Sequence, residues 1–155
     1  MTAIVLGGTS PHITLVRELK ERGYTVILVD YLPNPPAKAY ADRHIQESTL
    51  DMEKVLQIAK DEKADLVVSA CIDQTNSVCC YVAEKLGLPH PYDYQTSLAV
   101  TVKSVMKKVF LENGVPTSPY FAGKSVSDFS REVLLNYAKK IAPRCITTSC
   151  VPKSA

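Results

Sequence analysis

Short apolar runs alternate with amphipathic segments along the first part of the chain. Consecutive apolar residues, typical of strands buried on both faces, occur at residues 3–7, 24–30 and 64–70. Apolar residues recur at helical spacing in residues 11–22, in residues 51–63 and in the segment that Gly87 ends. This alternation predicts an α/β fold, a Rossmann-like parallel sheet flanked by helices.

The remaining segments are predicted from proline positions and helical spacing. Residues 31–42 and 88–94 are rich in proline and are predicted to be loops. A short strand is predicted at 43–47, between the first of these loops and the helix over 51–63. Residues 96–114 are predicted to form one helix with a buried apolar stripe of Leu98, Val102, Val105, Met106 and Val109.

A change of pattern after Gly114 predicts a domain boundary. The first domain is expected to span residues 1–116, and a second, incomplete one to span 117–155. The second begins with an extended segment, continues with a helix over 125–141 in which Ser125 and Asp128 form a capping pair, and ends in an atypical or disordered tail.

Composition narrows the classes of function. Hydrophobic residues make up 46% and charged residues 22%, as in ordinary globular proteins. The net charge of +2 is too small for a nucleic-acid-binding surface, and no apolar run is long enough to cross a membrane. Without a secretory leader, the five cysteines are expected to be reduced thiols of a cytoplasmic protein rather than disulfides or zinc ligands.

The sequence GGTS, at Gly7 to Ser10, is the first candidate site. A glycine-rich turn between a strand and a helix lets the backbone approach an anion at the helix N-terminus. The dinucleotide fingerprint G-x-G-x-x-G is broken here, which argues against NAD although Asp30 stands where a ribose-binding acid would lie. The alternative is a tight turn without a ligand.

Other polar residues are weighed against structural roles. His12, in the first turn of the helix, is expected to be either a polar surface residue or a direct participant at the mouth of the sheet. Asp73 and Gln74 follow the 64–70 strand and would face the same crevice as the glycine turn. The alternative is that Asp73 is an ordinary acidic residue at a helix N-terminus, where the helix dipole favours it. Lys103 and Lys107 share one helix face, which is either solvated or in contact with a nucleotide phosphate.

The ordered set of these segments resembles the ATP-grasp ligases over about residues 3 to 122. It consists of LGGTSPHITLV near the start, YLPNPPAKAYADRHIQ, and a helix with Lys103 before GVPTSPYF. The 31–46 stretch is similar to members related to the large chain of carbamoyl-phosphate synthase. The resemblance implies that the chain starts with the family's pre-ATP-grasp domain.

The resemblance also implies roles for particular residues. Lys103 would contact a nucleotide phosphate, and ATP and Mg²⁺ would be the cofactors of the complete enzyme. The pocket for a small carboxylate or amine substrate would be lined by Gly7, Gly8, Thr9, Ser10, His12, Asp73 and Gln74. D-alanine ligases carry a glutamate where this chain has His12, which argues against amino-acid ligation of that kind.

The C-terminal stretch departs from the family pattern. The family continues with a Lys-Pro, a glycine-rich loop and acidic metal ligands, whereas this chain ends in APRCITTSCVPKSA. We therefore expect the substrate-binding part of an ATP-dependent carboxylate–amine ligase, inactive alone. The alternative is a non-catalytic Rossmann-like module that binds a nucleotide or forms a homo-oligomer through exposed apolar surface.

Overall fold

The computed structural model describes residues 1–120, 122 and 125–141. The chain divides into two compact units, Met1–Thr117 and Ser118–Ala155. Their assignment to a pre-ATP-grasp domain and the start of an ATP-grasp subdomain stays a prediction. The expectations for the tail after residue 141, with Cys145 and Cys150, lie outside the described residues.

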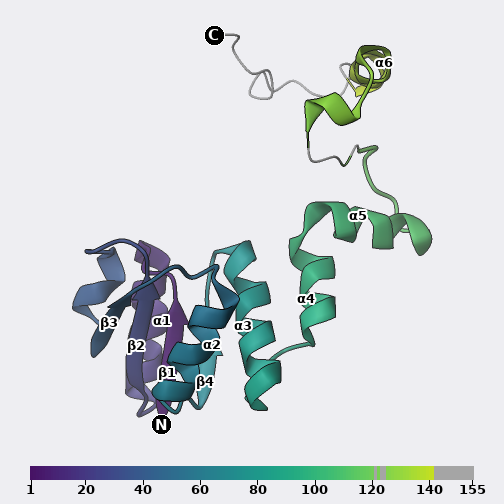
Figure 1. Ribbon diagram of the computed structural model, residues 1–155. Coiled ribbons are helices and arrows are strands. Elements are labelled where there is room, and N and C mark those ends of the chain that lie inside the picture. Colours follow the sequence, from purple (N-terminus) through teal and green to yellow (C-terminus); the bar gives the residue numbers. More distant parts are fainter. Residues whose placement is uncertain (121, 123–124, 142–155) are drawn as a thin grey trace. The chain divides into compact units, whose positions relative to one another are not determined.

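Four parallel strands form the centre of the first unit (Figure 1). Their bounds are β1 Thr2–Leu6, β2 Thr25–Asp30, β3 Arg43–Gln46 and β4 Leu66–Val68, and their order across the sheet is β3-β2-β1-β4. In the register of the central strand, Ile4 lies opposite Ile27 on one side and Val67 on the other. The predicted α/β class with a parallel sheet is confirmed.

Helices cover both faces of the sheet, with α1 behind it and α2 in front of it in Figure 1, and α3 packs into the same core cluster as α2. Their bounds are α1 Ser10–Glu21, α2 Met52–Asp61 and α3 Asp73–Leu86. Strand β1 alternates between the two layers, because Ala3 and Val5 pack with α1, whereas Ile4 and Leu6 pack with α2 and α3. A strand buried on both faces must be apolar at every position, which is the pattern of its sequence.

The prediction of one helix over 96–114 is wrong. Helix α4 spans Tyr94–Thr101 and helix α5 spans Lys103–Glu112, with Val102 in an extended conformation between them. The break follows a run of β-branched residues, which restrict helical side-chain rotamers. The Thr101 hydroxyl also donates to the Ser97 carbonyl oxygen at 2.7 Å, a bond that often bends helices.

The predicted apolar stripe on this segment is not buried. Helix α5 packs on α4 rather than on the sheet, and it has no buried residue within the described part of the chain. Val102, Val105 and Val109 are 39%, 38% and 37% exposed. The spacing of the stripe is helical, but no layer of the first unit covers it.

Two short 3₁₀ helices occur where the sequence predicted a loop and a longer helix. Pro36–Ala39 form η1, because proline fits the first turn of a helix. Val126–Asp128 form η2, and α6 begins only at Arg131 and ends at Ile141, so the predicted helix over 125–141 is divided. The predicted pair forms one half of a capping box, since the Ser125 N–H donates to the Asp128 carboxylate at 3.0 Å, but it lies at η2 and does not cap α6.

Candidate functional site

The carboxyl-terminal edge of the sheet carries two cavities, both within the first unit. The first, of about 290 Å³, is lined by residues that include Gly7, Thr9, Asp30, Leu50, Ile72 and Gln74. The second, of about 330 Å³, is lined by residues that include Ser69, Cys71, Ile72, Asp73, Asn76 and Tyr92. Ligands of parallel sheets bind at this edge, so both cavities are candidate binding sites.

Close packing explains the glycine pair between β1 and α1. Gly7 has a φ of +99°, and a Cβ on it would lie 2.8 Å from the Ile72 side chain. A Cβ on Gly8 would lie 2.4 Å from Cβ of Pro35, just before η1. The two glycines therefore let the turn pack against neighbouring loops, whether or not a ligand approaches it.

Asp30, at the end of β2, holds this turn in place. The residue is 5% exposed, and its carboxylate accepts hydrogen bonds from the Gly8 N–H at 2.6 Å and from the Leu32 N–H at 2.8 Å. Both carboxylate oxygens are thus engaged by the backbone. Asp30 occupies the position of a ribose-binding acid but acts here as a structural tie between β2 and the glycine turn.

Of the two alternatives for His12, the polar surface residue is wrong, because its side chain is fully buried, and a direct role stays a prediction. Nδ1 lies 2.8 Å from the Thr9 hydroxyl, and Nε2 accepts from the Ala70 N–H at 3.4 Å. His12 occupies the third glycine position of the dinucleotide fingerprint, where glycine allows close helix–strand packing. Here the imidazole fills that space and connects α1 with the turn after β4.

Burial makes His12 a source of acid sensitivity. Desolvation lowers the pKa of His12 from its ordinary value of 6.5, against smaller opposing effects of hydrogen bonds and of Asp30. Because the folded protein then binds fewer protons than the unfolded chain, stability is fully present above about pH 6.5 and is lost as the pH falls toward the lowered pKa.

We expect the free energy of unfolding to fall between about pH 7 and pH 5 in the wild type and to change less in His12→Gln. Urea denaturation at several pH values measures this difference, with His90→Gln as the control variant. The pKa values of Asp42 and Asp93 lie below their ordinary value, because hydrogen bonds favour the charged carboxylates, so these groups titrate at more acid pH. Equal acid sensitivity in wild type and His12→Gln would contradict the prediction.

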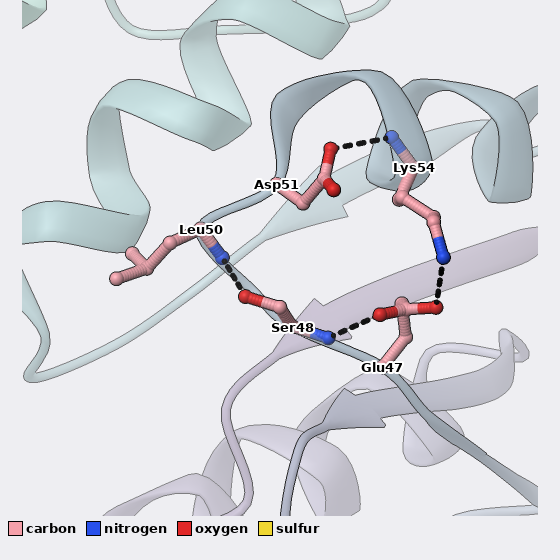
Figure 2. Close-up of polar contacts among 5 residues, drawn as sticks. All are labelled: Glu47, Ser48, Leu50, Asp51 and Lys54. Atoms are coloured by element: carbon pink, nitrogen blue, oxygen red, sulfur yellow. Dashed lines mark hydrogen bonds and ion pairs between the residues drawn. The ribbon is translucent and has the colours of Figure 1, made fainter.

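The loop between β3 and α2 forms a wall of the first cavity that sequence analysis missed. Ser48, Thr49 and Leu50 line the cavity. Figure 2 shows how the loop is held: Glu47 accepts from Lys54 at 2.9 Å and from the Ser48 N–H at 3.0 Å, while Asp51 caps α2. The signal was the position of Ser48 and Thr49 directly after a predicted strand of a parallel sheet.

The second cavity contains Asp73 together with residues that were also missed. The Asn76 side-chain amide donates to the Tyr92 hydroxyl at 2.9 Å, which joins α3 to the loop before α4. At the start of α5, Lys103 forms an ion pair of 3.5 Å with Asp73. Both side chains are about 70% exposed, so the pair adds little to stability and both charges remain accessible.

The structure brings together only part of the predicted site. Gly7, Thr9 and Gln74 line the first cavity and Asp73 lines the second, whereas Gly8, Ser10 and His12 line neither. Lys103 reaches the second cavity only through Asp73. No cluster of three or more potential metal ligands occurs among the described residues. No helix in that part of the chain is long and apolar enough to span a membrane.

Comparison with known proteins gives sequence relatives for most of this chain. No family model matches it. The formate-dependent phosphoribosylglycinamide formyltransferase of Haemophilus ducreyi is 28% identical over 131 residues, which make up 84% of this chain and 33% of that enzyme. The chain thus spans about a third of the length of the curated relatives it matches.

Solved structures share the fold. The phosphoribosylglycinamide synthetase of Anaerococcus prevotii gives a TM-score of 0.66 at 22% identity, with 87% of this chain and 34% of that chain covered. The glycinamide-RNase-transformylase T of Mycobacterium tuberculosis gives a TM-score of 0.69 at 20% identity, with 89% of this chain and 38% of that chain covered. These sequence relatives and structural neighbours are ATP-grasp ligases, and the chain matches their N-terminal part.

Proposed function

We propose that this chain is the N-terminal, substrate-binding part of an ATP-dependent carboxylate–amine ligase. The observation that carries the proposal is the first cavity, which the glycine turn, the β3–α2 loop and the start of α3 line together at the carboxyl edge of the sheet. One charged side chain, Asp30, also lines it, and its carboxylate already accepts from the Gly8 and Leu32 N–H groups. The other polar side chains, which include Thr9, Thr49 and Gln74, are uncharged hydrogen-bonding groups suited to a small polar substrate.

The names of the relatives support a substrate class. Four curated relatives are named formate-dependent phosphoribosylglycinamide formyltransferases, so a small carboxylate and a phosphoribosylated amine are the first substrates to test. The carbamoyl-phosphate synthase-like subtype rests on residues 31–46 alone. We therefore propose it only as the alternative, for which bicarbonate replaces formate as the probe.

ATP would supply the phosphoryl group that activates the carboxylate in the complete enzyme. Within the described residues, Lys103 is the side chain we assign to a nucleotide phosphate, because it is exposed and its charge is only weakly paired with Asp73. The described residues offer no acidic cluster for Mg²⁺. We propose that the charge stabilisation that phosphoryl transfer requires comes from outside the described residues and that the chain alone is inactive.

The exposed valines of α5 support a neighbouring polypeptide as the source of the missing groups. Such a neighbour would be the remainder of a ligase or, as the alternative, a second copy of this chain. We also propose that the protein is soluble in the cytoplasm and that it does not bind nucleic acid. Light scattering on the purified chain distinguishes a homo-oligomer from a monomer.

A thermal-shift experiment tests the proposed function. We expect phosphoribosylglycinamide or formate to raise the melting temperature of the 155-residue chain, because a ligand that binds only the folded state stabilises it. We expect no substrate-dependent ATP hydrolysis. A shift with NAD alone would favour the dinucleotide-binding module instead, and robust ATP turnover would contradict the proposed inactivity.

A further inference from the structure

The buried His12 ring lies between two turns that line the candidate pockets. On one side Thr9, which lines the first cavity, has its hydroxyl oxygen 2.8 Å from Nδ1. On the other side the Ala70 N–H points at Nε2 over 3.4 Å, and Ala70 lies in the turn that leads to Ile72 and Gln74. The ring therefore connects the β1–α1 turn to the β4–α3 turn.

The proton positions follow from the partners of Ser69. The Ser69 hydroxyl oxygen lies 2.6 Å from the Leu6 carbonyl oxygen, which only accepts, so the Ser69 proton is directed to that carbonyl. The Thr75 hydroxyl lies 2.7 Å from Ser69 Oγ and 2.8 Å from the Ile72 carbonyl oxygen. Ser69 Oγ is also 3.5 Å from His12 Nε2, but its proton is used by Leu6, so Ser69 is not a donor to the ring. The Ala70 N–H is then the donor to Nε2, so Nε2 is unprotonated and Nδ1 carries the proton of the neutral ring.

The tautomer of His12 determines what Thr9 can do. Since Nδ1–H donates, the Thr9 hydroxyl oxygen accepts that bond and keeps its own proton for another partner. Thr9 lines the first cavity, where an acceptor oxygen of a carboxylate or phosphate group would meet this proton. With the opposite tautomer, Thr9 would have to donate to the ring, and its proton would be lost to the pocket.

We propose that His12 is a positioning residue of the substrate pocket: as a neutral Nδ1–H imidazole it holds the β1–α1 and β4–α3 turns together and directs the Thr9 hydroxyl proton to an acceptor oxygen of the substrate. The proposal rests on the proposed function only in taking the first cavity as the substrate pocket. The link between the two turns stands on the hydrogen bonds of the chain itself.

Protonation of His12 breaks this link. A proton on Nε2 would face the Ala70 N–H, so two donors would oppose each other and the β4–α3 turn would lose its bond to the ring. Asp30, at the end of β2, is the charged group that acts on the ring and favours the imidazolium, whereas burial opposes it. Cys71 on the β4–α3 turn and Asp73 at the start of α3 are exposed, and Ser69 and Ala70 carry no charge.

The first experiment needs no ligand. Long-range ¹H–¹⁵N spectra of the full chain report the tautomer of each histidine, and the variants His44→Gln and His90→Gln assign the His12 signals. We expect the Nδ1–H form near neutral pH, and we expect the Ala70 and Gln74 amide signals to shift with the protonation of His12. An Nε2–H tautomer, or titration of His12 without any change at Ala70, would overturn the proposal.

The second experiment measures binding of phosphoribosylglycinamide and of formate by calorimetry between about pH 5 and pH 8. We expect Thr9→Val to weaken binding about tenfold at neutral pH, because one hydrogen bond to a charged acceptor is lost, whereas Thr9→Ser retains it. We expect affinity to fall toward acid pH in the wild type and in His90→Gln, but not in His12→Gln.

The two experiments separate the inference from the proposed function. If Thr9→Val binds as tightly as Thr9→Ser, or if His12→Gln retains the acid dependence of the wild type, the positioning role is wrong. If neither probe binds any variant, the assignment of these substrates to the pocket fails. In that case the spectra still decide whether His12 links the two turns. If the His12→Gln variant does not fold, the spectra of the wild-type protein remain the test.

Discussion

Replacing Asp30 by alanine is expected to lower the free energy of unfolding by about 2–4 kcal/mol, because it orphans one buried and one partly buried N–H, each costing roughly 1–3 kcal/mol. The Gly8 N–H is the buried donor, and the Leu32 N–H lies nearer the surface. No other acceptor in the described structure replaces the carboxylate at these groups. Such a loss is a large fraction of the stability of a small domain.

Asp30→Asn and Glu21→Ala complete the measurement. The asparagine keeps one acceptor oxygen in place, so its cost should lie between those of wild type and alanine. Glu21 lies exposed at the end of α1, and its replacement is expected to change stability by no more than about 0.5 kcal/mol. Urea denaturation measures all three variants, and an Asp30→Ala cost equal to that of Glu21→Ala would show that Asp30 does not hold the turn.

Gly8→Ala is expected to cost about 1–3 kcal/mol, because the new methyl group would overlap Pro35. The turn cannot simply move away, since the Gly8 carbonyl oxygen accepts from the Ala37 N–H at 2.9 Å and the Gly8 N–H donates to Asp30 at 2.6 Å. The overlap is with ring carbons that belong to a proline at the start of η1, which have little freedom to shift.

A double-mutant cycle with Pro35→Gly isolates this overlap. Removing the proline ring takes away the two nearest atoms that the new Cβ would meet and leaves Asp30 Oδ2 at 3.2 Å, so the double variant should lose less than the sum of the two single losses. A coupling of about 0.5–3 kcal/mol is typical of residues in direct contact. Strict additivity would mean that Gly8 is required for a reason other than the approach of Pro35.

The strands and their layers could be predicted because burial on both faces leaves a local record. The AIVL run of β1 has no polar position, which only a central strand of a covered sheet requires. The inner faces of α2 and α3 were predictable for the same reason, since Val55 and Val82 fall on single apolar stripes and are both fully buried. The helix break at Val102 could not be predicted, because the helical spacing of apolar residues continues across it.

The candidate site was predictable only as a location. The rule that ligands collect at the carboxyl ends of parallel strands indicated Thr9 and Gln74, and both line the first cavity. The same rule applied to β3 would have indicated Thr49. The rule does not tell which polar groups form hydrogen bonds within the protein itself. For that reason Asp30 resembled a ligand-binding acid in the sequence, although its carboxylate accepts from two backbone N–H groups.

By itself, the sequence determined the α/β class, the order of most elements and the edge of the sheet where polar groups gather. These depend on local periodicity and on the geometry common to all parallel sheets. The tertiary structure alone decided that His12 is buried, that Asp30 is bonded to the backbone and that the α5 stripe is exposed. Each of these depends on which distant segment packs against the residue, and that is a property of contacts between segments rather than of any one segment.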